Sequence, residues 1–518
     1  MTGAVLTIDL GTSGPKAAVV DAEGRVLGSA RASVATRFGP DGAAEQDPAE
    51  VWQATVDACR QATQAAGSTE CVALIASAQY SSVIPVDADG EPTLPMITWM
   101  DGRGSPRKLR SAGAGRTNPA HLADWFRRHG LAPIEAGITL NHLRWVRHAR
   151  PDEYARAAAF LEPADYLTLR LTGRATANPC TALMFLLTDN RTPTPTAWDR
   201  ALAAHAGIDV AKLPELVSAG SDVGPVLPAV AAELGIATGA RVLSGLNDTQ
   251  AGALASGAAT GDGAGLSLGT TAVIAARCAR HRADPRTSVF ASPGPCPTDA
   301  AGYLMSAENG LAGGALEHTS TLLYPGHAEP AERYAAFTAD AAAAPPGSRG
   351  VLFLPWLRGA LAPAADGRMR GGFLNVGLEH DRTHLARAVV EGISLNVRRL
   401  RRPAERYAGR RFDEFTVYGG GAQSDLWCQV LADVLQSPIR QLDHPGHANC
   451  IGIGLFAFAR LGVITDADIT ARVPVRHTYH PDSATAPVYA ELAERFAEAF
   501  KVTRPLFHHL HDARRLFR

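Results

Sequence analysis

The stretch TIDLGTSGPKAAVVDAEG, residues 7–24, decides the fold prediction. An apolar run over residues 5–10 enters a Gly-Thr-Ser-Gly turn, and a second apolar run covers residues 17–20. Apolar runs on both sides of a glycine-containing turn predict two strands joined by a hairpin. A third short strand is expected over residues 25–27. The turn matches neither the GxxxxGK[ST] nor the GxGxxG phosphate-loop spacing.

A second hairpin of the same kind is predicted about half a chain downstream, in GAGLSLGTTAVIAARC, residues 263–278. The echo indicates a duplicated architecture, although a coincidence of two short motifs remains the alternative. Strands and helices alternate in both halves, which predicts α/β domains. A chain of 518 residues is too long for one core. We expect an N-terminal domain over residues 1–247, a C-terminal domain over 248–480, and a terminal helix and tail over 481–518.

Charge and cysteine usage exclude several classes of protein. The net charge is −1, from 50 basic and 51 acidic residues, so we expect no nucleic-acid or membrane partner. The seven cysteines are scattered and form no CxxC pair, which is typical of reduced thiols in a cytoplasmic protein. We find neither a signal sequence nor an apolar run of the roughly 18–20 residues that span a bilayer. A cytoplasmic location is therefore expected.

The first Gly-Thr turn is a candidate phosphate site. Its backbone N–H groups and two hydroxyls can surround one anion. Asp9 precedes the turn and would repel phosphate unless a cation lay between them, which indicates Mg²⁺. Lys16 can add a positive charge. The alternative is a tight hairpin capped by Asp9, but a second such turn at residues 269–271 favours two hairpins that grip a polyphosphate from both sides.

Two further segments carry candidate binding groups. In residues 415–435, a strand ends in three glycines and Ser424 can cap the following helix. A strand, a glycine loop and a helix N-terminus often accommodate a nucleotide, although a packing turn is the alternative. Residues 97–103, ITWMDGR, combine an indole, a carboxylate and a guanidinium. This combination suits a polyol, and a surface Asp–Arg pair beside a half-buried tryptophan is the alternative.

Asp248 follows an apolar strand at the point where the chain enters its second half. A carboxylate at such a strand end lies where clefts form. It can accept a proton from a substrate hydroxyl that attacks phosphorus. A helix-capping aspartate is the alternative interpretation.

In this order and over essentially the whole chain, the motifs resemble those of the FGGY carbohydrate kinases, within the actin/hexokinase/heat-shock-chaperone ATPase superfamily. The opening turn is similar to the first phosphate motif and residues 267–274 to the second. Residues 246–258 resemble the catalytic segment, and residues 419–439 the adenosine motif. Further resemblance lies in EQDPAEVW (residues 45–52), in residues 98–103 and in the long segment 368–398.

The resemblance implies an α/β fold of two actin-like (ribonuclease H-like) domains with a cleft between them. It also implies ATP and Mg²⁺ as cofactors, a sugar or polyol substrate, Asp248 as the catalytic base and Asp9 at the metal. The implied ATP-binding residues are Gly11, Thr12, Ser13, Lys16, Gly269, Thr270, Thr271, Gly420, Gly421, Ala422 and Asp425. The implied substrate-binding residues are Gln79, Tyr80, Ser81, Trp99, Asp101 and Asn247. A homodimer is left open.

The layout is most similar to xylulokinase-like pentulose kinases, but this chain departs from them on the substrate side. Residues 79–82 are Gln-Tyr-Ser-Ser, where Gln-Met-His-Gly is usual. Gly-Ala-Leu-Ala-Pro replaces Gly-Glu-Arg-x-Pro at residues 359–363, and residues 306–314 replace a Ser-x-Gly-Gly-type turn. Pro15 also removes one N–H donor from the first loop.

The leading hypothesis is ATP-dependent phosphorylation of D-xylulose to D-xylulose 5-phosphate. Ribulose, erythritol and glycerol are the enzymatic alternatives, and glycerol is disfavoured because its kinases usually carry Arg-Glu at residues 80–81. Two other classes remain: an actin-like filament or chaperone ATPase, and a non-catalytic sensor that binds sugar and ATP.

Overall fold

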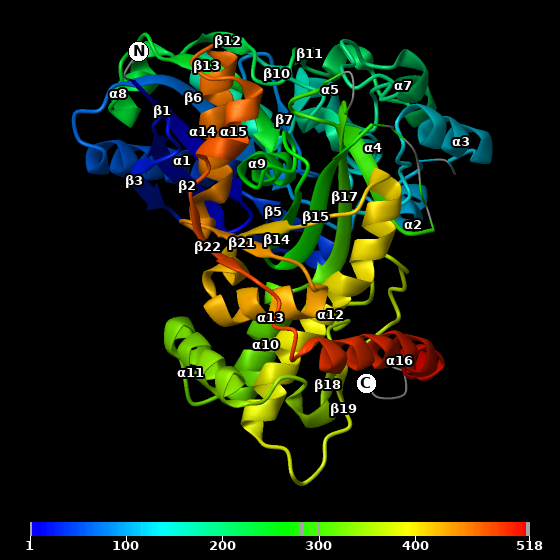
Figure 1. Cartoon of the computed structure of the whole chain (residues 1–518). Helices are drawn as coiled ribbons and strands as arrows, with labels where there is room; N and C mark the ends of the chain where they lie inside the picture. Colours follow the sequence, from blue (N-terminus) through cyan, green and yellow to red (C-terminus); the bar gives the residue numbers. More distant parts are fainter. Residues whose placement is uncertain are drawn as a thin grey trace.

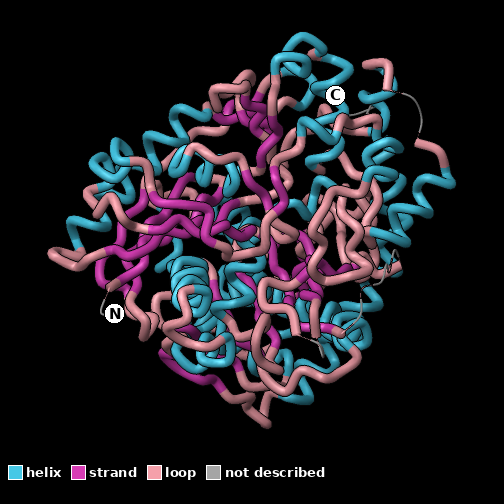
Figure 2. The backbone as a smooth tube through the Cα atoms, turned by 90° about the horizontal axis from the view of Figure 1, so that it is seen from above, coloured by secondary structure: helices cyan, strands magenta, loops and turns pink. Residues whose placement is uncertain are grey.

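The structure is a computed structural model, and it describes residues 3–114, 117–279, 281, 284, 286–298 and 301–513. The ends of the predicted first domain and of the predicted tail, residues 1–2 and 514–518, therefore lie outside the described residues. Two large mixed sheets form the body of the molecule, with helices packed on their faces (Figures 1 and 2).

The first sheet has the strand order β12-β13-β6-β1-β2-β3. The opening hairpin lies in it as predicted, since β1 and β2 are antiparallel around the Gly-Thr turn. β6 runs parallel to β1, and β13 runs parallel to β6. The strand bounds are β1 Ala4–Gly11, β2 Gly14–Val20, β3 Val26–Arg31, β6 Cys71–Ala78, β12 Asp222–Pro225 and β13 Arg241–Asn247.

The second sheet has the order β16-β17-β15-β14-β20-β21-β22. β14 and β15 form the second predicted hairpin, and β20 and β21 follow β14 in parallel. The bounds are β14 Ala264–Leu268, β15 Thr271–Cys278, β16 Val289–Pro293, β17 Tyr303–Leu311, β20 Phe415–Tyr418, β21 Ile439–Leu442 and β22 Val475–Tyr479. In each sheet, the first strand of the hairpin has two parallel strands on one side, β6 and β13 or β20 and β21. The second strand of the hairpin has an antiparallel neighbour on the other side, β3 or β17. The two halves therefore repeat one arrangement of strands, which confirms the predicted duplication.

Small sheets and short strands surround these two sheets. They comprise β4 Arg37–Phe38, β5 Ala44–Gln46, β7 Ile84–Val86, β8 Met96–Ile97, β9 Ala159–Leu161, β10 Thr176–Ala177, β11 Glu215–Leu216, β18 Leu352–Leu354 and β19 Gly372–Leu374.

The helices of the first half cover its sheet. α1 begins at Pro48 after the cap Asp47 and packs on β2 and β3, while α6 packs on β13. Their bounds are α1 Pro48–Ala65, α2 Pro106–Ser111, α3 Pro119–Arg128, α4 Thr139–Ala149, α5 Pro151–Arg156, α6 Pro163–Thr172, α7 Arg200–Ala206, α8 Pro228–Leu234 and α9 Asp248–Ala255.

In the second half, α12 packs on β15 and β17, and α16 covers α12 and α13. Tyr489, Leu492, Phe496 and Phe500 form the predicted buried stripe of α16. The bounds are α10 Gly313–Leu323, α11 Pro330–Ala343, α12 Arg382–Ala408, α13 Asp425–Leu435, α14 Ala448–Arg460, α15 Asp466–Arg472 and α16 Ala486–Asp512. Of the described helices, none is both long and apolar enough to cross a membrane.

One helix joins the two halves. α14 lies between β21 and β22 of the second sheet in the chain, yet it packs on β1, β2 and β6 of the first sheet and against α9 (Figure 1). A single hydrophobic cluster accordingly contains Val5 and Ile75 from the first sheet, Tyr418 from the second, and Ile451 of α14. The two sheets and α14 therefore share one continuous part of the hydrophobic core.

Candidate active site

Strand register places the candidate catalytic residues at one edge of the first sheet. Asp9 of β1 pairs with Ser77 of β6, and Ser77 pairs in turn with Leu246 of β13. The three parallel strands therefore end together, and their next residues include Gln79 and Asp248. In open α/β sheets, ligands bind outside the carboxyl ends of such strands.

Asp9 is held by groups from distant parts of the chain. Its Oδ1 accepts hydrogen bonds from Ser77 Oγ at 2.9 Å and from Asn449 Nδ2 at 3.0 Å. Its Oδ2 lies 3.9 Å from Lys16 Nζ, which also donates to the carbonyl of Gly446 at 3.1 Å. The carboxylate is thus fixed through Oδ1, while Oδ2 faces an exchangeable cationic partner.

A closed hydrogen-bond network supports the first Gly-Thr turn. Thr12 Oγ1 donates to Gln79 Oε1 at 2.9 Å, and Gln79 Nε2 donates to Gln46 Oε1 at 3.0 Å. Gln46 Nε2 completes the ring by donating to the Thr12 carbonyl at 2.8 Å. Trp99 Nε1 adds a hydrogen bond to Thr12 Oγ1 at 3.0 Å. The network connects the predicted phosphate turn directly to two predicted substrate residues, Gln79 and Trp99.

Gly14 shows why this turn needs glycine. Its φ is +131°, and a Cβ there would lie 2.2 Å from the Ala32 carbonyl oxygen. At Gly11, by contrast, a Cβ would approach only the Gly14 carbonyl oxygen, at 3.8 Å. Ser13 is exposed, so the turn is open to solvent on the side where a phosphate would approach.

Asp248 begins α9, with Asn247 as its cap through a hydrogen bond from the Gln250 N–H at 2.9 Å. Burial, which is the largest cause, and the nearby negative charge of Asp9 together raise the pKa of Asp248 to about 7, against hydrogen bonds from Thr249 that lower it. A carboxyl whose pKa lies near neutral pH is suited to general-base catalysis. The structure therefore favours the catalytic interpretation over a simple helix cap, because Asn247 already supplies the cap.

Backbone hydrogen bonds from the start of α10 hold the turn of the second hairpin in place. The N–H groups of Gly313 and Gly314 donate to the carbonyls of Gly269 and Thr270, at 2.9 and 3.1 Å. Thr270 itself is exposed, and its neighbour Thr271 hydrogen-bonds Glu308 of β17. With these carbonyls occupied, the outer side of the turn remains free to face a ligand.

The glycine loop follows β20 beside this hairpin. Ser424 caps α13 as predicted, through a hydrogen bond from the Trp427 N–H at 3.3 Å. A Cβ on Gly420 would meet nothing within 4 Å, whereas one on Gly421 would lie 2.8 Å from the Trp427 ring and 3.0 Å from Leu268 Cβ. Gly420 therefore borders open space, while Gly421 is required for packing.

Three predicted residues are engaged mainly by protein. Asp101 is fully enclosed, accepting hydrogen bonds from the Ala44 N–H and from Arg103. Ala422 is also fully buried. Asp425 accepts from Gln441 Nε2 at 3.1 Å and pairs with Arg476, and the hydrogen bond from Gln441 is the main cause of its lowered pKa. Their roles toward ligands stay predictions.

A narrow crevice lies beside Asp248, and its walls are too close together to admit a water molecule. Tyr80 forms one wall, and burial raises the pKa of its hydroxyl, with the negative charges of Glu308 and Asp248 adding to the effect. Ser81 has a φ of +62°, a left-handed conformation uncommon outside glycine and frequent at functional sites. The crevice is lined by Tyr80, Leu183, Asn247, Thr249, Gln250, Phe290, Ser292 and Ser306.

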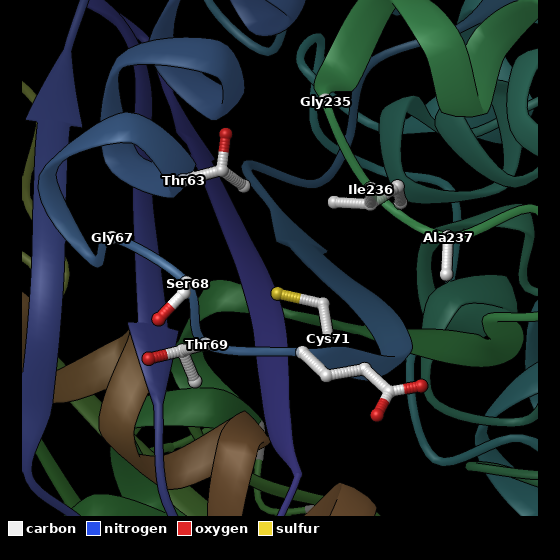
Figure 3. Close-up of a pocket in the computed structure, with 9 residues that line it drawn as sticks. Thr63, Gly67, Ser68, Thr69, Cys71, Gly235, Ile236 and Ala237 are labelled. Carbon is white, nitrogen blue, oxygen red and sulfur yellow. The ribbon is translucent and has the colours of Figure 1, made fainter.

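A second hollow, of about 280 Å³, lies elsewhere (Figure 3). It is bordered by the end of α1, by residues 67–71 and by the segment after α8. Cys71 is the first residue of β6, whereas Gln79 follows the last. Eight residues of strand span roughly 26 Å, so this hollow is at the opposite end of the sheet from the candidate site.

Several site residues were not singled out from the sequence. Ser77 is brought in by strand register and Asn449 by the packing of α14, and no local motif marks either residue. Gln250 and Glu308 lie within segments that the sequence did single out, residues 246–258 and 306–314, but neither side chain was named. Gln46 lies within the EQDPAEVW segment, so a signal for it existed, but its contact with the Thr12 carbonyl depends on the fold.

Comparison with known proteins identifies the family. The FGGY family of carbohydrate kinases, N-terminal domain, matches residues 4–255, and the C-terminal domain of the same family matches residues 264–461. The chain belongs to the FGGY family of carbohydrate kinases and is a sugar kinase, that is, a phosphotransferase.

Among curated relatives, a xylulose kinase of Staphylococcus epidermidis is 28% identical, with 97% of each chain covered. A gluconokinase of Bacillus licheniformis is 24% identical, with 96% of this chain and 95% of the relative covered. Among solved structures, a ligand-bound xylulose kinase from Lactobacillus acidophilus gives a TM-score of 0.84 at 22% identity, covering 98% of this chain and 99% of that chain. A Plasmodium falciparum glycerol kinase with ADP gives 0.80 at 17% identity, covering 96% and 98%. The predicted two-domain kinase fold is confirmed.

Asp248→Asn should stabilise the folded protein at neutral and alkaline pH. The native pKa of about 7 exceeds the usual value of 3.8, so between about pH 4 and 7 the folded chain holds a proton that the unfolded chain releases. Wild-type stability therefore falls as pH rises through that window. We expect Asp248→Asn to unfold about 2–5 °C higher at pH 8 and at nearly the wild-type temperature at pH 4. Calorimetry at both pH values would contradict this if the difference did not grow with pH.

Gly420→Leu should weaken ATP binding without unfolding the protein, because the new side chain would enter open space beside the glycine loop. We expect the KM for ATP to rise about tenfold or more, with little change in melting temperature. Gly421→Leu is the matched contrast, since it collides with Trp427 and Leu268 and should lower the melting temperature. An unchanged KM for ATP in a folded Gly420→Leu protein would remove the adenosine assignment.

Proposed function

We propose that this sugar kinase transfers the γ-phosphoryl group of Mg·ATP to a hydroxyl of a small neutral ketose or polyol, with D-xylulose as the first candidate and D-xylulose 5-phosphate as product. The observation that carries the proposal is Asp248, a carboxyl with a pKa of about 7 at the start of α9. It lies within the electrostatic influence of Asp9 beside the first turn and of Glu308, which hydrogen-bonds Thr271 of the second. These influences support a position for the proposed base between the two candidate phosphate turns.

The donor set around Asp9 fits Mg²⁺ held together with phosphates. Within the described residues there is no group of three or more His, Cys, Asp or Glu side chains that could form an all-protein metal cage. Mg²⁺ prefers one or two carboxylates, substrate phosphates and water. Asp9 would hold the ion through Oδ2, because Oδ1 is occupied by Ser77 and Asn449. The ion would neutralise charge on the phosphates of ATP.

The chain's own residues account for the remaining steps. The hairpins around Thr12 and Thr270 would hold the β- and γ-phosphates through backbone N–H groups and hydroxyls. Deprotonated Asp248 would accept the proton of the attacking hydroxyl as its oxygen bonds to phosphorus and the bond to the leaving ADP oxygen breaks. The indole of Trp99, 39% exposed and tied to Thr12, would cover one face of the sugar.

The crevice favours a neutral substrate over an aldonate such as gluconate. No cationic side chain from the described part of the chain lines it. The charges that most affect the pKa of Tyr80 are the carboxyls of Glu308 and Asp248. A substrate carboxylate would be repelled there without a compensating partner. Together with the xylulose kinase relatives at 26–28% identity, this supports a ketose or polyol.

A substrate panel tests the proposal. We expect ADP release above the ATP-only background with D-xylulose, and a kcat/KM for gluconate at least about 100-fold lower, the effect expected of an unpaired charge in the site. Ribulose, erythritol and glycerol complete the panel as the alternative acceptors. A preference for gluconate would overturn the neutral-substrate proposal. Background hydrolysis alone across the panel would favour the non-catalytic sensor.

Asp248→Asn should lower kcat about 10²–10⁴-fold, the usual contribution of a positioned general base, with ATP affinity nearly unchanged. The wild-type activity should also fall below about pH 7, as Asp248 becomes protonated. Single-turnover kinetics and nucleotide titration separate the two effects. Near-full activity of the variant would place the base elsewhere. The homodimer and the cytoplasmic location stay predictions.

A further inference from the structure

Glu162 is a buried carboxyl that joins two segments near the predicted substrate residues. It directly precedes α6 and is 1% exposed, yet its side chain makes no capping hydrogen bond to that helix. Its Oε2 instead accepts a hydrogen bond from the Ser82 N–H at 3.2 Å. Its Oε1 is hydrogen-bonded to the hydroxyl of Thr139, the first residue of α4. One carboxyl therefore connects the loop after β6 with the start of α4.

The loop over residues 79–82 contains a backbone conformation that needs support. Backbone hydrogen bonds hold its two ends, at Gln79 and at Val83. Between them, Ser81 is buried with a φ of +62°. A left-handed conformation is unfavourable for a residue with a side chain, and it persists only where the surrounding structure enforces it. The hydrogen bond from the next N–H to Glu162 supplies such a constraint from the buried side.

The same contacts extend to the backbone of Trp99. Ser82 is fully buried, and its Oγ accepts a hydrogen bond from the Trp99 N–H at 3.1 Å. A Cβ on Gly137 would lie 2.1 Å from the Trp99 carbonyl oxygen, so the chain just before α4 packs directly against this backbone. Thr139 follows two residues later. Glu162 therefore holds, through Ser82 and through Thr139, two segments that contact Trp99.

The surroundings of Glu162 keep its carboxyl neutral. Burial raises its pKa well above the ordinary value, and the negative charge of Asp165 adds to the effect, against hydrogen bonds from Thr139 and from the backbone of Ser82. A neutral carboxyl offers one accepting oxygen and one O–H donor. Because Oε2 accepts from the backbone, the O–H is on the side of the Thr139 hydroxyl. A glutamine offers the same pair of groups, with its carbonyl and its NH₂.

We propose that Glu162 is a positioning residue of the sugar site: its carboxyl holds residues 79–82, and through Ser82 the Trp99 backbone, in the arrangement that binds the acceptor sugar. This assignment rests on the proposed function and deepens it, because Gln79, Ser81 and Trp99 are among the proposed sugar contacts. The segments that Glu162 holds carry these contacts. Its loss should therefore weaken sugar binding more than ATP binding.

The test compares the wild type with Glu162→Gln and Glu162→Met. Glutamine keeps one acceptor and one donor, so we expect a KM for the preferred sugar of the panel within about twofold of the wild type. Methionine has a similar volume but leaves the Ser82 N–H without its acceptor. We expect its sugar KM to rise about 10–100-fold, while kcat and the KM for ATP change less than about threefold. Without substrate, hydrogen exchange of a peptide that contains residues 79–83 should be faster in Glu162→Met alone.

Glu391→Gln is the matched control for a general loss of stability. Glu391 is also a buried glutamate that accepts a hydrogen bond from a backbone N–H, that of Gly347 at 2.8 Å. It lies in the second half of the chain, where it holds α12 to Tyr489 of α16 and pairs with Arg387. Its substitution should lower the melting temperature and leave the sugar KM unchanged.

The outcomes separate this assignment from the proposed function. A folded Glu162→Met protein whose sugar KM is unchanged, or rises by the same factor as its KM for ATP, would overturn the assignment while the kinase proposal stands. A Glu162→Gln protein as weak as Glu162→Met would also overturn it. If Glu162→Met does not fold, Thr139→Val removes the partner of Oε1 alone and should raise the sugar KM at least about threefold. An unchanged KM there would overturn the assignment.

Failure of the proposed function leaves a decisive measurement. If the wild type phosphorylates no sugar of the panel, the proposed function fails. Hydrogen exchange of residues 79–83 then decides whether Glu162 holds the loop, because it requires no substrate. Equal exchange in Glu162→Met and the wild type would overturn the assignment, and faster exchange in Glu162→Met, reversed in Glu162→Gln, would support it.

Discussion

The site depends above all on the parallel register of β1, β6 and β13. Asp9, Ser77 and Leu246 lie side by side across these strands, so three chain segments leave the sheet at the same level. A slip of one residue in any strand would turn its side chains to the other face and separate Asp9 from Ser77. The second sheet has the same alignment of strand ends: Ser267 of β14 pairs with Tyr418 of β20, and the glycine turns that begin at Gly269 and Gly419 follow these two strands. In each sheet, the alignment of strand ends brings together the residues that we propose as ligand groups.

This arrangement brings like charges together. Asp9 is buried, and its negative charge adds to burial in raising the pKa of Asp248. The raised pKa of Asp248 means that ionisation of this carboxyl, which is the form required by its proposed role as catalytic base, opposes folding. The protonated form of Asp248 favours folding, whereas the proposed catalytic role requires the ionised form. A cation beside Asp9 would relieve the repulsion, so the cofactor and the base are linked through their electrostatics.

The sequence predicted best those parts of the candidate site that consist of local backbone structure. The two Gly-Thr hairpins, the strand and glycine loop over residues 415–421 and the Ser424 cap follow local rules of turn and helix formation, and each was located correctly. Gln46, Gln250 and Asn449 were not predicted as site residues, because their roles arise from contacts between segments far apart in the chain. Glycine positions indicate where the backbone turns, because glycine adopts conformations that other residues avoid. A glutamine does not indicate which distant residue its side chain contacts.

Asn449 shows how far this non-local contribution extends. It lies at the start of α14, and its amide is bound to Asp9, 440 residues earlier in the chain. Lys16 makes the reciprocal connection, from the first hairpin to the carbonyl of Gly446 just before α14. The N-terminal end of α14 thus contacts two polar side chains of the first sheet, while the apolar face of the helix packs on the same strands. A shift of α14 would move the partners of Asp9 directly, so the geometry of the proposed metal site is set jointly by the two halves of the protein rather than by the opening turn alone.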